Sequence, residues 1–323
     1  MSSSSEIGIY CLANDNVVEW AVALFESLRV YEPRRRLCVI PFDENVGELR
    51  RLSSKYDYTI LEDDSLEELD EIGRMFWPDH KGIKTFRKFA AFWGPFRDFL
   101  FLDSDIVILG GLEKFCEVYL RREHDLIYFD RDINEVYRPG AFQEKMVREH
   151  GAQGFVTGNF FAPRGLFTLD EVRAYAAEAA PHKHELAATF EQPFINYCAD
   201  VKGVRVASFQ DVIPGFVGSW AGLPGLRKVG EEYWLQPLSR DGGSAVPMVH
   251  WAGYRLRPSM PYSDVYLQFR LLGIDSKAER LKFKARWLID DLVNSAKGAV
   301  ISASDSALGG KLDFLFRSRR GGR

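Results

Sequence analysis

The 323-residue chain has few cysteines, no long apolar run and no excess of positive charge. Its four cysteines are scattered without a Cys-x-x-Cys pair, which argues against a disulfide framework or a zinc site and favours reduced thiols in a core. No apolar run approaches the roughly 18 residues of a membrane span, and the Ser-rich start lacks the features of a signal peptide. A net charge of -4 argues against a nucleic-acid-binding protein. These absences predict a folded cytoplasmic protein.

Segments typical of strands alternate with segments typical of amphipathic helices over the first two thirds of the chain. We expect strands at residues 7–12, 37–42, 58–61, 99–102, 126–129 and 204–209, and helices at residues 18–30, 49–56, 84–93 and 169–180. Strand, helix and strand in this order predict right-handed parallel crossovers, and therefore an α/β fold. Residues 214–247 are rich in Gly, Pro and Trp, which predicts irregular loops over a site.

Two acidic side chains stand at the end of one expected strand. Asp103 and Asp105 follow the apolar residues 99–102 and precede the apolar residues 106–109. Alternate side chains of an extended chain point the same way, so the two carboxylates together make half of a divalent-cation site. Mg²⁺ and Mn²⁺ take oxygen ligands and leave positions to phosphate oxygens, so this pair suits a diphosphate substrate. Two solvated turn aspartates are the alternative interpretation.

Other polar residues are expected at the same edge of the sheet, because ligands of open parallel sheets bind beyond the carboxyl ends of the strands. The loop of Ala13, Asn14 and Asp15 follows the first strand, and Asp43 follows the second. We expect Asp15 and Asp43 to accept hydrogen bonds from the base or ribose of a nucleotide. A helix cap is an equally good interpretation of Asp15, and a turn residue an equally good one of Asp43.

Four motifs, in order along the chain, resemble those of GT-A glycosyltransferases, and more narrowly the glycogenin and galactosyltransferase group called family 8. The motifs are Leu102-Asp103-Ser104-Asp105-Ile106-Val107, Thr157-Gly158-Asn159-Phe160-Phe161, Glu191-Gln192-Pro193-Phe194-Ile195-Asn196, and the nine residues from His250 to Pro258. The resemblance implies a GT-A fold, which is Rossmann-like, with a mixed, mostly parallel sheet and helices on both faces. We expect this catalytic domain to span residues 1–262.

The resemblance also implies a metal ligand and a set of charges for a departing diphosphate. His250 would complete a Mn²⁺ or Mg²⁺ site with Asp103 and Asp105, whereas by its sequence context alone it would be a core histidine. Gly253 would let the backbone approach the phosphates, and Arg255 or Arg257 would replace the family's lysine. The spacing departs from the family pattern, which leaves the choice between the two arginines open.

Further positions correspond to residues that hold the donor sugar in the family. Ser104 is assigned to the donor site with its neighbouring aspartates. Arg87 and Lys88 lie where the family keeps a basic residue over the sugar, with solvated surface residues as the alternative. Asn159 would hold donor hydroxyls, or else satisfy loop backbone. Glu191 and Gln192 are the candidates for the carboxylate and amide beside the anomeric carbon.

Taken with these residues, the resemblance implies a metal-dependent glycosyltransferase that takes a sugar from a nucleoside diphosphate, by resemblance UDP. The acceptor is unknown and could be a saccharide, a lipid-linked molecule or a small molecule. When the sugar leaves, negative charge grows on the β-phosphate and positive charge on the anomeric carbon, so opposite charges must face the two. Retention of the anomeric configuration is implied by resemblance alone. The sequence names neither the sugar nor the oligomeric state.

Three other functions compete with this prediction. Residues 103–107 also fit the start of haloacid-dehalogenase-like phosphatases, in which Asp103 would be a nucleophile, although two strand and helix units precede the motif here. A nucleotidyltransferase needs a Gly-rich loop after the first strand, and residues 11–18 contain no glycine. A non-catalytic nucleotide-sugar-binding protein remains compatible with the same residues.

The C-terminal residues 263–323 are expected to form a helical extension. Amphipathic helices are predicted at residues 265–272 and 277–293, the second of them basic, and the Gly-rich residues 317–323 are expected to be mobile. These helices either cap the catalytic body or lie on an anionic membrane surface, which would place the protein at the inner face of a membrane.

Overall fold

The computed structural model describes residues 7–223, 225–230, 232–235 and 244–289. The predicted mobile tail and the last residues of the predicted basic helix lie outside these ranges. Within them, no helix combines the length and the apolar composition that crossing a membrane requires. All four cysteines are buried and free, as their scattered positions predicted.

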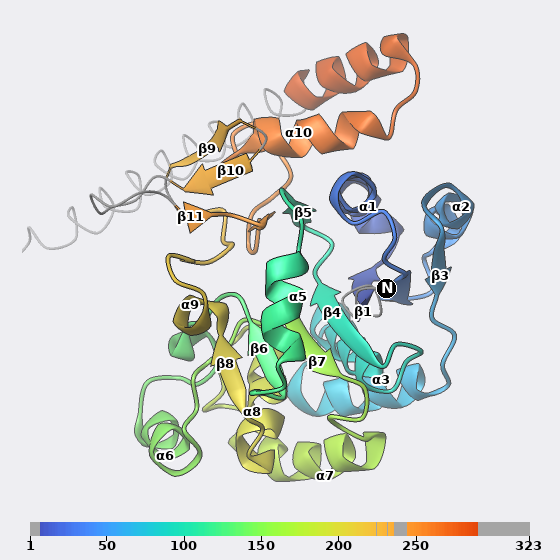
Figure 1. The fold of residues 1–323 in the computed structure, drawn as a ribbon. Helices are drawn as coiled ribbons and strands as arrows, with labels where there is room; N and C mark the ends of the chain where they lie inside the picture. The colour runs from blue at the N-terminus through green and yellow to red at the C-terminus, as the bar shows by residue number, and fades with distance from the viewer. Residues whose placement is uncertain (1–6, 224, 231, 236–243, 290–323) are drawn as a thin grey trace, which may run out of the picture.

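A seven-stranded sheet lies at the centre of the described chain, in the order β3-β2-β1-β4-β7-β6-β8 (Figure 1). Its strands are β1 (Ile7–Ala13), β2 (Leu37–Pro41), β3 (Tyr58–Ile60), β4 (Asp98–Leu102), β6 (Leu126–Tyr128), β7 (Asn159–Pro163) and β8 (Val206–Ser208). Neighbours pair in parallel except at β7, which runs antiparallel to β4 and β6. The predicted mixed, mostly parallel sheet is confirmed.

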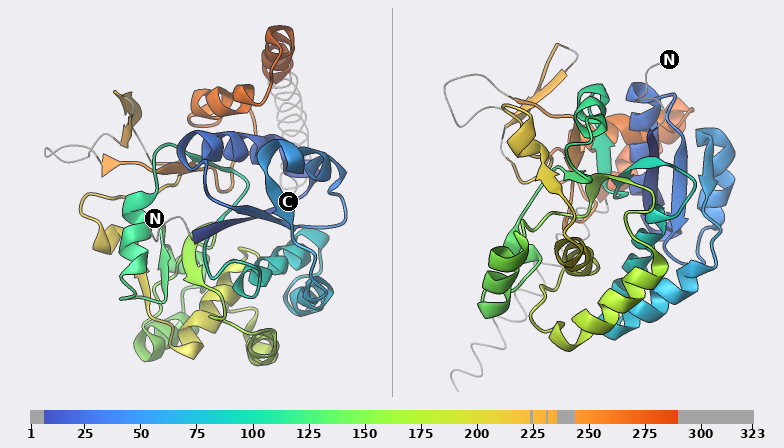
Figure 2. Two further views of the ribbon diagram at one scale, coloured as in Figure 1. Left: turned by 45° about the vertical axis from the view of Figure 1, so that its right-hand side comes forward. Right: turned by 60° about the horizontal axis from the view of Figure 1, so that its bottom comes forward.

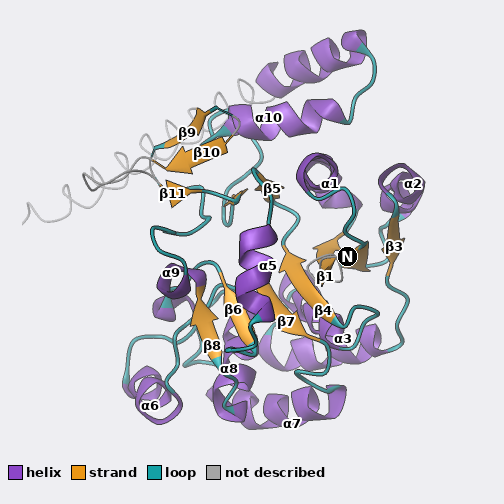
Figure 3. Cartoon of the chain, viewed as in Figure 1, coloured by secondary structure: helices purple, strands orange, loops and turns teal. Residues whose placement is uncertain are grey.

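Helices cover both faces of this sheet (Figures 2 and 3). The α-helices are α1 (Val18–Tyr31), α2 (Gly47–Tyr56), α3 (Ser65–Phe76), α4 (His80–Thr85), α5 (Glu113–Leu120), α6 (Ala141–His150), α7 (Leu169–Ala179), α8 (Gln192–Lys202), α9 (Phe209–Val212) and α10 (Ser263–Leu272). Short 3₁₀ helices are η2 (Asp15–Val17), η3 (Phe86–Phe92), η4 (Ile133–Glu135) and η5 (Ala180–His182). Residues 277–289 form a further helix.

The alternation of side chains along each strand divides the core into two layers. In β4, Phe99 and Phe101 pack into one cluster of apolar side chains, whereas Leu100 and Leu102 pack into the cluster on the other face. Burial on both faces explains why the central strands are apolar throughout. The carboxyl ends of these strands are left to carry the polar residues of the site.

A second, smaller pairing joins distant parts of the chain beside the main sheet. β5 (Ile106–Ile108) pairs antiparallel with β12 (Met248–His250). A third apolar cluster covers this pair and includes Trp20 from α1, Trp251 after β12, and Tyr266 from α10. The first helix of the predicted extension therefore packs on the body, and a domain boundary at residue 262 stays a prediction.

The expectation of irregular loops at residues 214–247 was partly wrong. This stretch contains β9 (Leu226–Val229), β10 (Glu232–Leu235) and β11 (Ser244–Ala245), which form an antiparallel sheet in the order β11-β10-β9. The Gly and Pro residues obscured these strands because they break the stretch into segments too short to show an alternating pattern. The predicted helix at residues 84–93 is in fact the end of α4 followed by η3.

Candidate metal and donor site

Three metal-ligand side chains converge where β4, β5 and β12 meet. Asp103 follows β4, and His250 is the last residue of β12, which places it opposite Ile106 of β5. Nε2 of His250 lies 3.3 Å from Oδ1 of Asp105 and 3.8 Å from Oδ2 of Asp103. One ligand atom from each residue fits within 4.8 Å of the others. A single cation can therefore contact all three.

The exposure of the three side chains suits a ligand that approaches from solvent. His250 is 4% exposed, whereas the carboxylates of Asp103 and Asp105 are 31% and 25% exposed. Two carboxylates and an imidazole are a donor set that Mn²⁺ and Mg²⁺ accept, with the remaining positions left for other oxygens. The residues present thus fit the metal that the sequence predicted.

Backbone hydrogen bonds hold the ligands in this arrangement. The Asp103 N–H donates to the carbonyl of Gly158 at 2.7 Å, and the Trp251 N–H donates to the carbonyl of Asp105 at 3.0 Å. The His250 N–H donates to the carbonyl of Ser219 at 2.8 Å. Residues far apart in the sequence are therefore fixed by paired strands, which is the rigid support that a metal site needs.

Gly158 lies directly against the side chains of Asp103 and His250, which together with that of Asp105 are called the cluster below. A Cβ atom at this position would come 2.2 Å from Cε1 of His250 and 2.9 Å from Oδ2 of Asp103. No side chain fits there without displacing a ligand. The requirement for glycine at this position is therefore steric.

Lys88 lies between Asp103 of the cluster and Glu191 at the start of α8. Its Nζ is 3.1 Å from Oδ1 of Asp103, 2.6 Å from Oε1 of Glu191, and donates to the carbonyl of Thr157 at 3.0 Å. Burial disfavours the charged ammonium, but Asp103 and then Glu191 outweigh this effect and raise the pKa of Lys88. Lys88 is therefore a buried permanent cation, and the alternative of a solvated surface residue is wrong.

Burial and the neighbouring charges shift the pKa values of the three side chains in the cluster. Burial raises the pKa of Asp103 to about 6, although Lys88 opposes the shift. Burial disfavours the charged form of Asp105 too, but His250 outweighs it and lowers the pKa of Asp105. Burial would lower the pKa of His250, yet Asp105 raises it overall. A cation bound here would take the place of the proton that His250 and the acids otherwise hold.

The candidates for the face of the anomeric carbon sit at the start of α8. Oε1 of Glu191 accepts from Lys88 and from the Thr157 hydroxyl at 3.0 Å. Gln192 bridges two loops, because its Oε1 accepts from the Thr157 N–H at 3.1 Å and its Nε2 donates to the carbonyl of Glu135 at 3.2 Å. Both polar atoms of Gln192 are thus bonded to backbone, whereas Glu191 belongs to the charged group around Lys88.

Asn159 lies beneath the cluster and is fully buried. Its Nδ2 donates to Oγ of Ser219 at 2.7 Å, and Ser219 donates in turn to Oδ2 of Asp130 at 2.5 Å. Oδ1 of Asn159 is a buried oxygen without a hydrogen-bond partner among the described residues. The side chain connects β7 to the loop between α9 and β9. Its described hydrogen bond there is to a side chain and not to loop backbone, so its predicted role toward donor hydroxyls stays a prediction.

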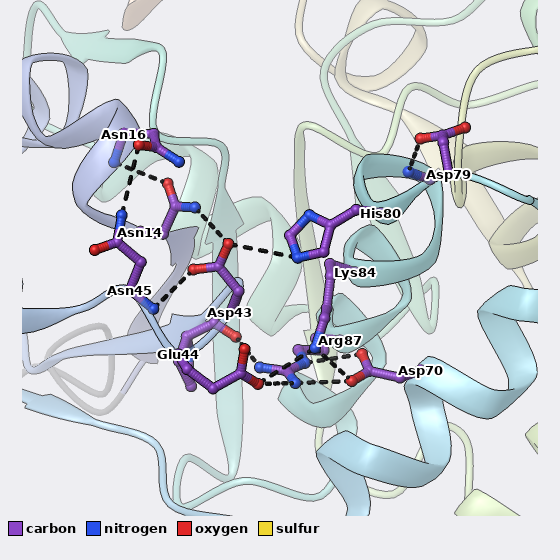
Figure 4. Close-up of polar contacts among 12 residues, drawn as sticks. Asn14, Asn16, Asp43, Glu44, Asn45, Asp70, Asp79, His80, Lys84 and Arg87 are labelled. Atoms are coloured by element: carbon purple, nitrogen blue, oxygen red, sulfur yellow. Dashed lines mark hydrogen bonds and ion pairs between the residues drawn. The ribbon is translucent and has the colours of Figure 1, made fainter.

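The loop after β1 and the residues after β2 form a polar group at the carboxyl ends of these two strands (Figure 4). Nδ2 of Asn14 donates to Oδ2 of Asp43 at 2.9 Å, and Nε2 of His80 lies 3.7 Å from the same oxygen. Asp15 turns away, because its two oxygens accept from the backbone N–H groups of Glu48 and Leu49 at 2.8 and 3.0 Å. Asp15 therefore caps a helix, α2, which agrees with the second of its two interpretations. Asp43 contacts Asn14.

Arg87 is buried in a neighbouring ionic network (Figure 4). Its guanidinium donates to both oxygens of Asp70, at 2.9 and 2.8 Å, and to Oε1 of Glu44 at 3.1 Å. Lys84 joins the network through Asp70 at 2.8 Å. The two adjacent basic residues therefore have different surroundings. Lys88 contacts Asp103, whereas Arg87 contacts Asp70 and Glu44.

The remaining predicted residues lie at the end of β1 or in the segments that follow β4 and β12. Ala13 is buried, and its carbonyl accepts from the Phe42 N–H at 2.9 Å. Ser104 is half-buried between the two aspartates. Gly253 has a φ of +79°, a conformation that favours glycine. Arg255 and Arg257 are exposed in the loop that follows it.

Sequence reasoning missed several residues that the structure brings to the cluster. Asp130 follows β6 and receives the Ser219 N–H at 2.9 Å, and Trp220 forms a β-bridge with His250. The Trp220 side chain is 46% exposed beside the site. Asp130 could have been found, because it ends an expected strand as Asp43 does. Trp220 lies in the Trp-containing stretch of residues 214–247 that was expected over a site, but no pattern singled out this residue.

Solved structures with the same fold include known glycosyltransferases. The galactosyltransferase LgtC, in complex with donor and acceptor sugar analogues, aligns with a TM-score of 0.58 at 15% identity over 84% of this chain and 98% of that chain. An active-site mutant of LgtC aligns at 0.57 and 14% over 81% and 95%. The bifunctional glycosyltransferase WbbM aligns at 0.52 and 14% over 86% of this chain and 51% of that chain.

These likenesses concern the fold. No protein-family model matches the sequence, and no curated protein is similar to it. At such low identity the alignments establish that the chain has the GT-A fold of glycosyltransferases, as the resemblance of its motifs predicted.

Proposed function

We propose that the protein is a metal-dependent glycosyltransferase that transfers a sugar from a nucleoside diphosphate to an acceptor. The observation that carries this proposal is the convergence of Asp103, Asp105 and His250 at the strand ends of a GT-A fold. Fold alone does not determine function, but a matching donor set at this position adds chemistry to the fold. Mn²⁺ or Mg²⁺ is the cofactor that these ligands suit.

The charges of the chain fit the demands of sugar transfer. A metal held by the three ligands would supply positive charge to a departing diphosphate. The exposed Arg255 or Arg257 adds a second cation on that side, while Gly253 allows a close backbone approach. Glu191, held by Lys88 and Thr157, supplies the negative charge for the face of the anomeric carbon. Gln192 acts by holding the Thr157 backbone in place.

The nucleotide is proposed to bind beside Asn14 and Asp43, where polar groups from β1 and β2 meet. UDP is the preferred nucleotide, and retention the preferred stereochemical course, because the motifs resemble family 8. The LgtC structure with donor and acceptor sugar analogues supports the same general use of this fold. NMR spectroscopy of the freshly formed linkage tests the stereochemical course, and inversion would contradict it.

A phosphatase with Asp103 as its nucleophile is the second candidate function. The fold favours the transferase, because the structural neighbours are glycosyltransferases. A nucleotide-sugar-binding protein without turnover would use the same residues. Assays with phosphoesters and with nucleotide sugars distinguish the three functions.

A thermal-unfolding panel tests the proposal directly. UDP-sugars, GDP-sugars and other nucleotide sugars are each added with and without Mn²⁺, since a ligand that binds the native state raises its apparent stability. We expect a shift that needs both the metal and one nucleotide sugar, followed by metal-dependent release of the nucleoside diphosphate. Asp105→Ala should abolish the metal-dependent shift.

Asp132→Ala is a matched control, because Asp132 caps η4 through the Asn134 N–H and lies outside the cluster. This variant should keep the shift of the unmodified protein. Nucleotide binding without metal, or release of phosphate from simple phosphoesters, would contradict the proposed function.

A further inference from the structure

The helix of residues 277–289 has two opposite faces with different surroundings. It follows α10 and lies beyond it, at the outer edge of the molecule (Figures 1 and 2). Trp287 stacks on Tyr266 of α10 with ring centroids 5.3 Å apart, and Arg270 of α10 lies over the ring of Phe283 at 4.6 Å. Phe283 and Trp287 are four residues apart, so they mark the face that is attached to the protein.

The opposite face is apolar and exposed. Leu281, Leu288 and Ile289 are 68%, 58% and 56% exposed. Together with Ala285 they recur at i, i+4, i+7 and i+8, which places them on one stripe of the helix. They are the most exposed large apolar side chains of the described chain. Single exposed apolar residues are ordinary, but a continuous stripe on one helix indicates an interaction surface.

Cations border this stripe on both sides. By helical spacing, Lys277 and Lys284 lie along one border, and Lys282 and Arg286 lie along the other. Residues 277–289 carry five basic side chains and one acidic side chain, in a protein whose net charge is -4. Long basic side chains beside an apolar stripe can extend toward phosphate head groups while the stripe is buried.

We propose that this helix lies on the surface of an anionic lipid bilayer, with Leu281, Leu288 and Ile289 inserted among the lipids. The charge pattern favours a bilayer over a protein partner, because the cations follow the whole length of the stripe on both sides instead of forming a single patch. The inference concerns a surface away from the metal cluster and does not rest on the proposed function.

The attachment of the helix would hold the metal site at a fixed position relative to the bilayer. Tyr266, which stacks on Trp287, also packs against Trp251, with ring centroids 6.4 Å apart. Trp251 follows His250 directly in the sequence. A helix that contacts lipid is therefore joined through two aromatic side chains to the element that carries a metal ligand.

Co-sedimentation of the full chain with vesicles tests the proposal. Vesicles of phosphatidylcholine alone are compared with vesicles that also contain phosphatidylglycerol, at low and at high salt. We expect binding only to the anionic vesicles, and weaker binding at high salt. The double substitution Leu281→Glu and Leu288→Glu should weaken binding by about tenfold or more, and so should Lys282→Glu with Lys284→Glu.

Two matched controls come from exposed positions of α6. Ala141→Glu with Val147→Glu introduces the same charge as the double leucine variant, and Lys145→Glu with Arg148→Glu reverses two cations as the double lysine variant does. Both should bind vesicles as the unmodified protein does. All variants are checked by thermal unfolding and light scattering, and the substitutions at exposed positions should leave the midpoint and the oligomeric state unchanged.

Three results would overturn the proposal. The first is a lack of binding to anionic vesicles at low salt. The second is a dimer that dissociates when Leu281 and Leu288 are replaced, because a second copy would then cover the stripe. The third is a lower unfolding midpoint in that variant, because the chain itself would then cover the stripe.

Discussion

Gly158 is constrained by two side chains, His250 and Asp103, that are distant from it in the sequence. We expect Gly158→Ala to weaken Mn²⁺ binding about tenfold or more, because its Cβ would meet His250 at 2.2 Å and Asp103 at 2.9 Å. Isothermal titration calorimetry measures the affinity. Gly110→Ala is the control, because a Cβ there has no neighbour within 4 Å. Equal affinities of the two variants would show that Mn²⁺ binds elsewhere.

Asp200 gives a prediction about pH. Burial raises the pKa of its carboxyl to about 7, although the Tyr137 hydroxyl, 2.6 Å from Oδ2, opposes the shift. A raised pKa means that the native state binds the proton more tightly than the unfolded state does. The resulting stability is therefore complete below about pH 4, the ordinary range of an aspartate, and is lost as the pH rises to about 7.

Asp200→Asn should remove this loss. Relative to the variant, the unmodified protein should lose a few kcal/mol of unfolding free energy, as an order of magnitude, between pH 4 and pH 8. Urea unfolding at several pH values measures the difference. Tyr137→Phe is the complementary control, since it removes the hydroxyl that stabilises the charged form of Asp200. In this variant the loss of unfolding free energy should extend to higher pH. Parallel curves for the unmodified protein and Asp200→Asn would contradict the assignment.

The proposed metal ligands and the residues that support them differ in how far the sequence could identify them. Asp103 and Asp105 could be assigned together because strand periodicity gives their direction, and His250 because four motifs resemble those of one family. The closeness of Gly158 to the cluster depends on the pairing of β4 with β7, which no local pattern specifies. Lys88 and Arg87 are adjacent, so only the orientation of η3 could show which one reaches Asp103.

At the scale of elements, α2 begins with a cap that comes from another part of the chain. Val46 stands at its N-cap without a side-chain bond, and Asp15 accepts from the backbone N–H groups of Glu48 and Leu49 instead. Asp15→Ala should therefore lower the free energy of unfolding by about 1–2 kcal/mol. Asp15→Asn keeps one acceptor and should lose less. Unchanged stability in urea, combined with weaker binding of a nucleotide sugar, would instead show that Asp15 contacts the donor.

The sequence predicted correctly those elements that bury a regular row of apolar side chains. β1 and α1 were placed within one residue of their observed ends, because their apolar side chains follow strand and helix spacing. In contrast, α6 was missed, since Met146 is its one buried residue. A helix that buries so little surface leaves no periodic signal, although its C-terminal Gly151 has the left-handed conformation of a helix end.

For the whole molecule, the third apolar cluster decides whether the C-terminal helices fold with the body. Tyr266 of α10 packs against Trp20 of α1, with ring centroids 5.1 Å apart, and its hydroxyl donates to the carbonyl of Glu19 at 3.2 Å. Trp251 lies in the same cluster, directly after the proposed metal ligand His250. Because one cluster joins the start of the chain, the strand β12 and α10, we expect them to unfold in a single transition.

Tyr266→Ala tests this expectation. Loss of a large buried aromatic side chain should lower the free energy of the single transition by about 3–5 kcal/mol. Leu272→Ala is the control on the same helix, because Leu272 is 43% exposed and its replacement should change stability by less than about 0.5 kcal/mol. Calorimetry and urea unfolding measure both variants. If the residues from 263 onward formed a separate domain, Tyr266→Ala would leave the main transition in place, and the affinity for Mn²⁺ would not change. A cooperative core instead predicts that this substitution also weakens Mn²⁺ binding, because Trp251, the residue after His250, would lose one of the rings against which it packs.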